Sequence, residues 1–123
     1  MTRRVLIIDD EEAIQTIVKV SLELTAGWTV LTTSSSIEGL EKAKEERPDA
    51  ILLDVMMPET DGVTLLQQLR TEPLTQDIPV IFLTAQARAS ERRSLEAIAT
   101  GLISKPFEPD AIARQIREIL NWS

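Results

Sequence analysis

Three carboxylates stand at the ends of two short apolar runs in this sequence. Asp9 and Asp10 follow the run at residues 5–8, and Asp54 follows the run at residues 50–53. Apolar runs of this length are typical of strands that are buried on both faces of a parallel sheet. Open α/β sheets bind their ligands at the carboxyl ends of the strands. The three acids therefore predict an acidic cleft in which the function resides.

A hydroxyl group and an ammonium group follow two further apolar runs, at Thr84 and Lys105. Neighbouring strands lie about 4.8 Å apart, so these side chains can converge with the acids on one small volume. Three carboxylates this close repel one another unless a cation neutralises them, and a site of oxygen ligands suits Mg²⁺. An acid cluster with one hydroxyl and one lysine indicates phosphoryl transfer onto a carboxylate.

Strand-like and helical patterns alternate along the whole chain. The predicted strands are residues 4–9, 29–33, 50–54, 79–84 and 101–105. Five repeats of strand and helix predict a parallel sheet covered on both faces. Because crossovers between parallel strands are right-handed, the pattern favours an α/β fold, a doubly wound (βα)5 three-layer sandwich with a five-stranded parallel sheet.

The intervening segments carry apolar side chains at helical spacing, and we expect these to face the core. They are Ile14, Ile17, Val18 and Leu22; Ile37, Leu40 and Ala43 after the capping box Ser35-Ser36-Ile37-Glu38; Val63, Leu66 and Leu69; Leu95 and Ile98 in the weaker segment 87–99; and Ile112, Ile116, Ile119 and Leu120 after Pro109. Val20 and Leu24 are interpreted as flanks of the first buried stripe, with a partner-docking surface as the alternative. Trp28 and Trp122 are interpreted as packing residues at the edges.

Composition excludes several classes of protein. The 123 residues suit a single domain, residues 1–123, with no segment left for an output domain. A net charge of −7 argues against nucleic-acid binding, and no segment is apolar enough to span a membrane. The chain has no cysteine and no histidine, and its start lacks a signal-peptide pattern. We expect a cytoplasmic protein that depends on another protein for any phosphohistidine chemistry.

Five short motifs follow one another along the chain. They are Ile8-Asp9-Asp10-Glu11, Leu52-Leu53-Asp54-Val55-Met56-Met57-Pro58, Asp61-Gly62, Leu83-Thr84-Ala85 and Lys105-Pro106-Phe107. In order and spacing, these motifs resemble the receiver domain of bacterial response regulators, the CheY-like family. Each motif is weak alone, but together they are specific and cover the chain from Val5 to Leu120. The resemblance implies a flavodoxin-like sheet with strand order 2-1-3-4-5.

The resemblance also implies roles for the site residues. Asp54 would accept the phosphoryl group, and Asp10 and Asp54 would bind Mg²⁺ together with the backbone carbonyl of Met56. Asp9 would act on the metal mainly through water. Thr84 and Lys105 would bond the phosphoryl oxygens and carry the signal outward.

The partners that the resemblance implies are proteins. The phosphoryl donor would be a histidine kinase or a phosphotransfer protein, and output would be contact with an unidentified downstream protein. The chain itself would be a monomer or a weak homodimer. It would be a signalling switch rather than an enzyme, because it catalyses only its own phosphorylation and dephosphorylation.

One position departs from the family pattern. The family commonly has Tyr or Phe three residues before the lysine, where the ring turns inward on activation. Here that position is Leu102, and the chain contains no tyrosine. An aliphatic side chain can repack but has no hydroxyl to form a new hydrogen bond.

The same residues can also be interpreted as structural residues without a function, or as the site of another class of protein. Asp9 or Asp10 alone would be read as a helix cap, and Lys105 alone as a solvated side chain. A hydrolase with an aspartyl-phosphate intermediate would have a further acid two residues past the nucleophile, where this chain has Met56. A flavodoxin-like cofactor binder would have a glycine-rich turn after the first strand, where this chain has acids.

Overall fold

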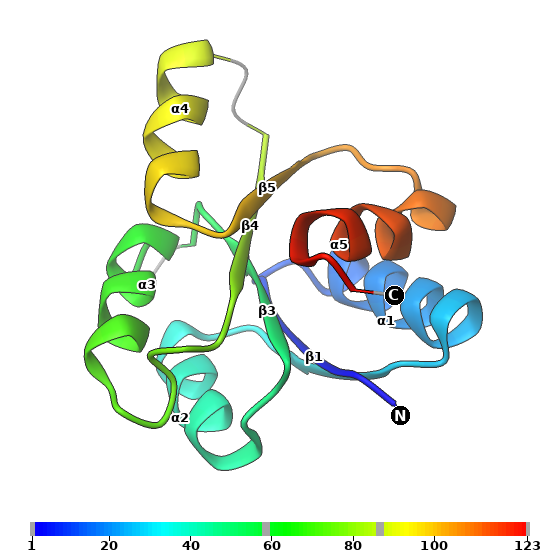
Figure 1. Cartoon of the computed structure of the whole chain (residues 1–123), viewed down its shortest axis with the longest axis horizontal. Coiled ribbons are helices and arrows are strands. Elements are labelled where there is room, and N and C mark those ends of the chain that lie inside the picture. Colours follow the sequence, from blue (N-terminus) through cyan, green and yellow to red (C-terminus); the bar gives the residue numbers. More distant parts are fainter. Residues whose placement is uncertain (1, 58–59, 86–87, 123) are drawn as a thin grey trace.

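The computed structural model describes residues 2–57, 60–85 and 88–122, and these form one parallel sheet with helices on both faces (Figure 1). The strands are β1 (Arg4–Ile8), β2 (Thr29–Thr33), β3 (Ala50–Asp54), β4 (Val80–Thr84) and β5 (Gly101–Ser104). The helices are α1 (Glu12–Ala26), α2 (Ser36–Glu46), α3 (Gly62–Thr71), α4 (Ala89–Ile98) and α5 (Ile112–Leu120), and the 3₁₀ turn η1 (Pro109–Ala111) precedes α5. The predicted strands agree to within one residue at each end. Pro58 of the second motif and residue 87 of the fourth helical pattern lie outside the described residues.

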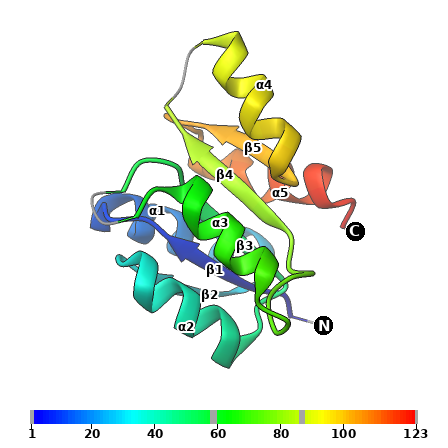
Figure 2. The same cartoon turned by 90° about the vertical axis from the view of Figure 1, so that its left-hand side faces the viewer.

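The sheet order is β2-β1-β3-β4-β5, and every pairing is parallel. Figures 1 and 2 show α1 and α5 on one face of the sheet and α2, α3 and α4 on the other. This is the predicted doubly wound three-layer sandwich with the flavodoxin-like strand order. The prediction of fold class is therefore confirmed.

Two apolar cores follow from the alternation of side chains along the strands. Ile7 and Leu52 face α1 and α5, where Val18, Leu22 and Ile116 pack against them. Leu6, Ile51 and Phe82 belong to the opposite core, with residues of α2, α3 and α4. Because successive side chains of a strand point to opposite faces, the continuous apolar runs supply both cores at once.

Helix α2 turns two of its three predicted apolar residues toward the core, because Ala43 is fully buried and Leu40 packs against the core, but Ile37 does not follow the prediction. Ser35 caps the helix as expected, and its side chain accepts a hydrogen bond from the backbone N–H of Glu38 at 3.4 Å. Ile37, however, is 68% exposed, and the buried residues are Ser36, Gly39 and Ala43. A Cβ at Gly39 would lie 2.7 Å from Ile8 Cδ1. The helix approaches the sheet too closely for a large side chain on that face, so the small residues pack inward.

The apolar stripe of α1 is also narrower than predicted. Val18 and Leu22 are fully buried, whereas Ile17 and Val20 are exposed and Leu24 is 81% exposed. Val20 and Leu24 do not extend the buried stripe that they are expected to flank, and the docking-surface alternative remains a prediction. Helix α1 contacts the sheet and α5 through one of its faces (Figure 1). Its opposite face has no neighbouring element among the described residues, so the apolar side chains there stay exposed.

Trp28 and Trp122 do pack at the edge of the fold, as predicted. Their rings meet edge to face, with centroids 5.3 Å apart. The guanidinium of Arg3 lies over the Trp122 ring and that of Arg117 over the Trp28 ring, at 4.3 and 5.2 Å from the centroids. Cation–π contacts of this kind join the two ends of the described chain.

Candidate functional site

Four of the predicted site residues lie at or just past the carboxyl ends of the strands. Asp54 is the last residue of β3, and Asp9 follows β1, which pairs with β3 in the sheet. Thr84 is the last residue of β4, the other neighbour of β3. Lys105 follows β5, and its backbone N–H donates to the Thr84 carbonyl oxygen at 2.8 Å. The parallel sheet thus places these side chains at one edge, as the sequence predicts.

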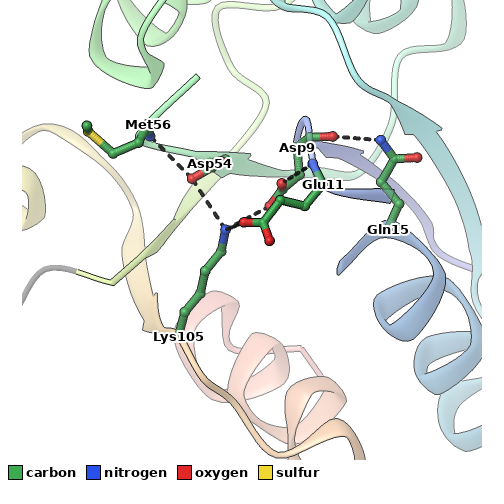
Figure 3. Close-up of polar contacts among 6 residues, drawn as sticks. All are labelled: Asp9, Glu11, Gln15, Asp54, Met56 and Lys105. Atoms are coloured by element: carbon green, nitrogen blue, oxygen red, sulfur yellow. Dashed lines mark hydrogen bonds and ion pairs between the residues drawn. The ribbon is translucent and has the colours of Figure 1, made fainter. Parts of the chain in front are cut away.

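Lys105 is the centre of the charge cluster (Figure 3). Its Nζ lies 3.0 Å from Asp9 Oδ2, 3.4 Å from Asp54 Oδ1 and 3.5 Å from Glu11 Oε1. Burial lowers the pKa of Lys105, but the hydrogen bond to Asp9 and the charges of the three acids together raise it above its usual value. The ammonium group therefore stays charged and acts as the counterion of the acids.

Asp54 has the most perturbed carboxyl group of the site. Its side chain is buried, and its Oδ1 accepts a hydrogen bond from the backbone N–H of Met56 at 3.2 Å. Burial and the neighbouring charge of Asp9 raise the pKa of Asp54 to about 6, although Lys105 and the Met56 hydrogen bond oppose that rise. A buried carboxylate with a raised pKa gains from a further positive charge.

Asp9 is held in place by the start of α1. It is fully buried, and its Oδ1 accepts a hydrogen bond from the backbone N–H of Glu11 at 2.9 Å. The Gln15 side chain donates from Nε2 to the Asp9 carbonyl oxygen at 2.6 Å. These two bonds fix the turn between β1 and α1, so the Asp9 carboxylate keeps its direction toward Lys105.

A glycine keeps α3 close to Asp54. A Cβ at Gly62 would lie 2.6 Å from the Asp54 carbonyl oxygen and 2.9 Å from Val55 Cα. Gly62 also donates its N–H to the Val55 carbonyl oxygen at 2.8 Å. Only glycine fits this approach of α3 to the end of β3, which explains the Asp61-Gly62 pair at this place in the sequence.

The structure does not bring every predicted residue into the cluster. Asp10 is exposed and is not among the close-set acids of the described residues. The backbone carbonyl of Met56 as a metal ligand stays a prediction. Thr84 is buried at the end of β4. Leu102 pairs with Phe82 in the sheet and packs against the core on the side of α2, α3 and α4. The Lys105–Pro106 peptide bond, whose isomer the sequence does not specify, is cis.

Glu11 belongs to the site although the sequence did not single it out. The carboxylate oxygens of Asp9, Glu11 and Asp54 can all lie within 4.8 Å of one another. In the sequence, Glu11 is one of four consecutive acids at the start of a helix, where acids commonly favour the helix dipole. The run of acids in the sequence indicates that an acid near Asp9 could belong to the site. Only the side-chain geometry shows that this acid is Glu11 and not Glu12.

This group of oxygen atoms fits a divalent cation. All three side chains are carboxylates, and hard ions such as Mg²⁺ prefer oxygen ligands. Burial is the main cause of the raised pKa of Asp54, and the charge of Asp9 adds to it, so a cation at the cluster would favour the charged form of Asp54. The donor set and the charge balance thus suit a magnesium site.

Comparison with known proteins decides the family. The profile of the response regulator receiver domain matches residues 5–117. The chain belongs to this family. It is a receiver domain of a two-component system, and proteins of this family bind Mg²⁺ at an acidic site.

Curated relatives are longer proteins. The chain is 38% identical over 124 residues to the alkaline phosphatase synthesis transcriptional regulatory protein PhoP of Bacillus subtilis, and this match covers all of the chain and 50% of PhoP. It is 37% identical over 118 residues to the DNA-binding dual master transcriptional regulator RpaA of Synechocystis, covering 95% of the chain and 48% of RpaA. The receiver chain therefore spans about half the length of these relatives.

Solved structures match the receiver domain along its whole length. The chemotaxis response regulator CheY4 of Vibrio cholerae has a TM-score of 0.89 at 29% identity, covering 97% of this chain and 99% of that one. The receiver domain of a sensor histidine kinase from Pseudomonas aeruginosa PAO1 has a TM-score of 0.86 at 26% identity, covering 98% and 99%. That structure is described with a magnesium ion coordinated in the active-site cleft.

No helix within the described residues of our chain is long and apolar enough to cross a membrane.

Proposed function

We propose that this receiver domain accepts a phosphoryl group on Asp54 from a histidine kinase or a phosphotransfer protein and signals by protein contact. The observation that carries the proposal is the buried Asp54 carboxylate at the end of β3, with the Lys105 ammonium 3.4 Å away. A carboxylate in this setting is an available nucleophile, and the neighbouring cation can receive a phosphoryl oxygen.

In the proposed reaction, an Asp54 carboxylate oxygen attacks the phosphorus of a phosphohistidine. The bond from phosphorus to the imidazole nitrogen breaks, and the imidazole leaves with the electron pair. Residues 1–123 contain no histidine, so the donor imidazole lies outside them, and we propose that it belongs to a histidine kinase or a phosphotransfer protein. Lys105 and the Thr84 hydroxyl stabilise the negative charge on the transferred oxygens.

The residues that would hold Mg²⁺ are Asp10, Asp54 and the Met56 backbone carbonyl, with Asp9 acting through water. The metal would supply positive charge that offsets the repulsion between the acids and the incoming phosphoryl group. Asp10 is exposed in the structure, and its role as a metal ligand is part of the proposal. Lys105 supplies the positive charge in the metal-free protein.

The proposal also states whether the protein turns over a substrate, what kind of partner it contacts and where it is located. Met56 stands two residues past Asp54, where a phosphatase of this chemistry would need a second acid, so we propose a switch without substrate turnover. The net charge of −7 supports output through protein rather than nucleic acid for residues 1–123. We propose a cytoplasmic regulator that is a monomer or a weak homodimer.

Phosphorylation of Asp54 is tested with acetyl phosphate and Mg²⁺. We expect intact-mass spectrometry to show one added phosphoryl group on the wild-type protein and none on Asp54→Asn. Asp61→Asn is the matched control, because Asp61 caps α3 through its hydrogen bond to Thr64 and lies outside the acid cluster. Equal uptake by Asp54→Asn and the wild type would refute the assignment.

Asp10→Ala should weaken Mg²⁺ binding by at least about tenfold, because even outer-shell partners of metal ligands commonly contribute that much. Isothermal titration calorimetry measures the affinity directly. Glu12→Ala removes an exposed charge two residues further along and should change the affinity little. An unchanged affinity in Asp10→Ala would show that Asp10 is not a ligand.

A further inference from the structure

Glu11 directs its carboxylate at the site rather than at its own helix. It is the residue before α1, with an extended backbone, and its side chain makes no capping hydrogen bond to the helix. Its Oε1 lies 3.5 Å from Lys105 Nζ instead (Figure 3). A glutamate at this place would ordinarily serve the positive end of the helix dipole. Here its contact partner is the lysine that we propose to bind the phosphoryl group.

The Lys105 ammonium has as many carboxylate partners as it has protons. An ammonium group offers three donors, and Asp9, Asp54 and Glu11 lie at 3.0, 3.4 and 3.5 Å. An incoming phosphoryl oxygen that bonds Lys105 must therefore displace one of them or share its donor.

The three carboxylates differ in how easily they can leave. Asp9 has the shortest contact and a fully buried side chain, and Asp54 is the group that would be phosphorylated. The Glu11 side chain is 60% exposed and has the longest contact with Lys105. Turning Glu11 into solvent costs little, because exposed ion pairs are weak and water replaces the partner. Glu11 is thus the carboxylate that an incoming phosphoryl oxygen displaces from Lys105.

We propose that Glu11 is a positioning residue that holds Lys105 in the unmodified protein and slows phosphorylation of Asp54 by anionic donors. The inference rests on the proposed function, since it concerns the rate at which Asp54 accepts its phosphoryl group. Glu11 acts in two ways, by occupying a donor of Lys105 and by adding negative charge beside the path of the anion.

The test compares Glu11→Gln with Glu12→Gln, which removes the same charge from the neighbouring exposed position. Initial rates of Asp54 phosphorylation by acetyl phosphate are measured by mass spectrometry at saturating Mg²⁺. We expect Glu11→Gln to react about two- to fivefold faster than wild type, the range that an exposed ion pair supports. The advantage should shrink at about 0.5 M salt, because exposed charges are screened. Glu12→Gln should react at the wild-type rate.

A second measurement needs neither metal nor donor. The mobility of the Lys105 side chain is measured by NMR relaxation in metal-free protein, where Glu11 Oε1 lies 3.5 Å from Lys105 Nζ. We expect Glu11→Gln to make the Lys105 side chain more mobile and Glu12→Gln to leave its mobility unchanged. A purely structural role for Glu11 would alter thermal stability without this difference.

Equal or slower phosphorylation of Glu11→Gln relative to the wild type would overturn the inference, as would an unchanged mobility of the Lys105 side chain. Failure of the proposed function gives a different result, because the wild-type protein would then show no more uptake than Asp54→Asn. In that case the NMR comparison still decides whether Glu11 holds Lys105.

Discussion

Lys105→Met is expected to destabilise the metal-free protein by about 3 kcal/mol at alkaline pH, because it removes the cation from two buried carboxylates. Asp9 is fully buried and Asp54 nearly so, and Lys105 lies within 3.4 Å of both. The methionine keeps most of the volume and loses only the charge and its hydrogen bond. Urea unfolding of both proteins in the presence of a chelator measures the loss.

The cost should depend on pH and on Mg²⁺. Asp54 already has a pKa raised to about 6, and without Lys105 it will hold its proton to still higher pH. Protonation relieves the repulsion, so the destabilisation should be smaller in mild acid. Mg²⁺ binds only the folded site and should stabilise Lys105→Met more than wild type, since no ammonium competes with it.

The matched control is Lys44→Met. Lys44 pairs with Glu41 at 3.2 Å on the surface of α2, and such pairs contribute less than about 1 kcal/mol. Similar losses for the two variants would mean that burial of the acids around Lys105 has no energetic consequence. A loss in Lys105→Met that Mg²⁺ does not reduce would argue against a metal in the acid cluster.

Asp54→Asn is expected to stabilise the metal-free protein at neutral pH by on the order of 2 kcal/mol. The folded carboxyl group has a pKa of about 6 against 3.8 for its ordinary value. Between these two pH values the folded state binds more protons than the unfolded state, so stability falls as pH rises and the full cost is present above about pH 6. Asparagine removes this charge and can still accept the Met56 hydrogen bond.

The sign of the effect is checked by urea unfolding at two pH values, with a chelator present. The gain should be largest at neutral pH and small near pH 4, where Asp54 is protonated in the folded wild type. Asp110→Asn, at an exposed acid of η1, should show no such dependence. A variant that is less stable than wild type at neutral pH would show that Lys105 outweighs burial at this position.

The fold could be predicted because its signals are local and repeated. Four of the five strands are continuous apolar runs that end in a polar side chain, and parallel pairing leaves few ways to arrange them. The helix faces were less predictable. Ile37 fits a helical stripe as well as Ser36 does, and only the close approach of α2 to Ile8 selects the small residues.

The site could be predicted in composition but not in its contacts. Strand order brings Asp9, Asp54 and Lys105 to one edge, and the sequence indicates each strand end. The spacing of apolar residues does not show that Glu11, as well as Asp9, contacts Lys105 among the four acids at residues 9–12. The choice of Glu11 depends on the turn after β1, which the hydrogen bond from Glu11 N–H to Asp9 sets.

The edge-to-face pair of Trp28 and Trp122 has a practical consequence for spectroscopy. The chain contains only these two tryptophans, and Trp28 precedes β2 at the amino end of the sheet, opposite the edge that bears the acids. Their shared emission arises from one small volume beside Arg3 and Arg117. Intrinsic fluorescence therefore reports on the contacts between Trp28, Trp122 and the two ends of the described chain. An optical readout of Asp54 phosphorylation requires a fluorophore introduced near the carboxyl ends of the strands.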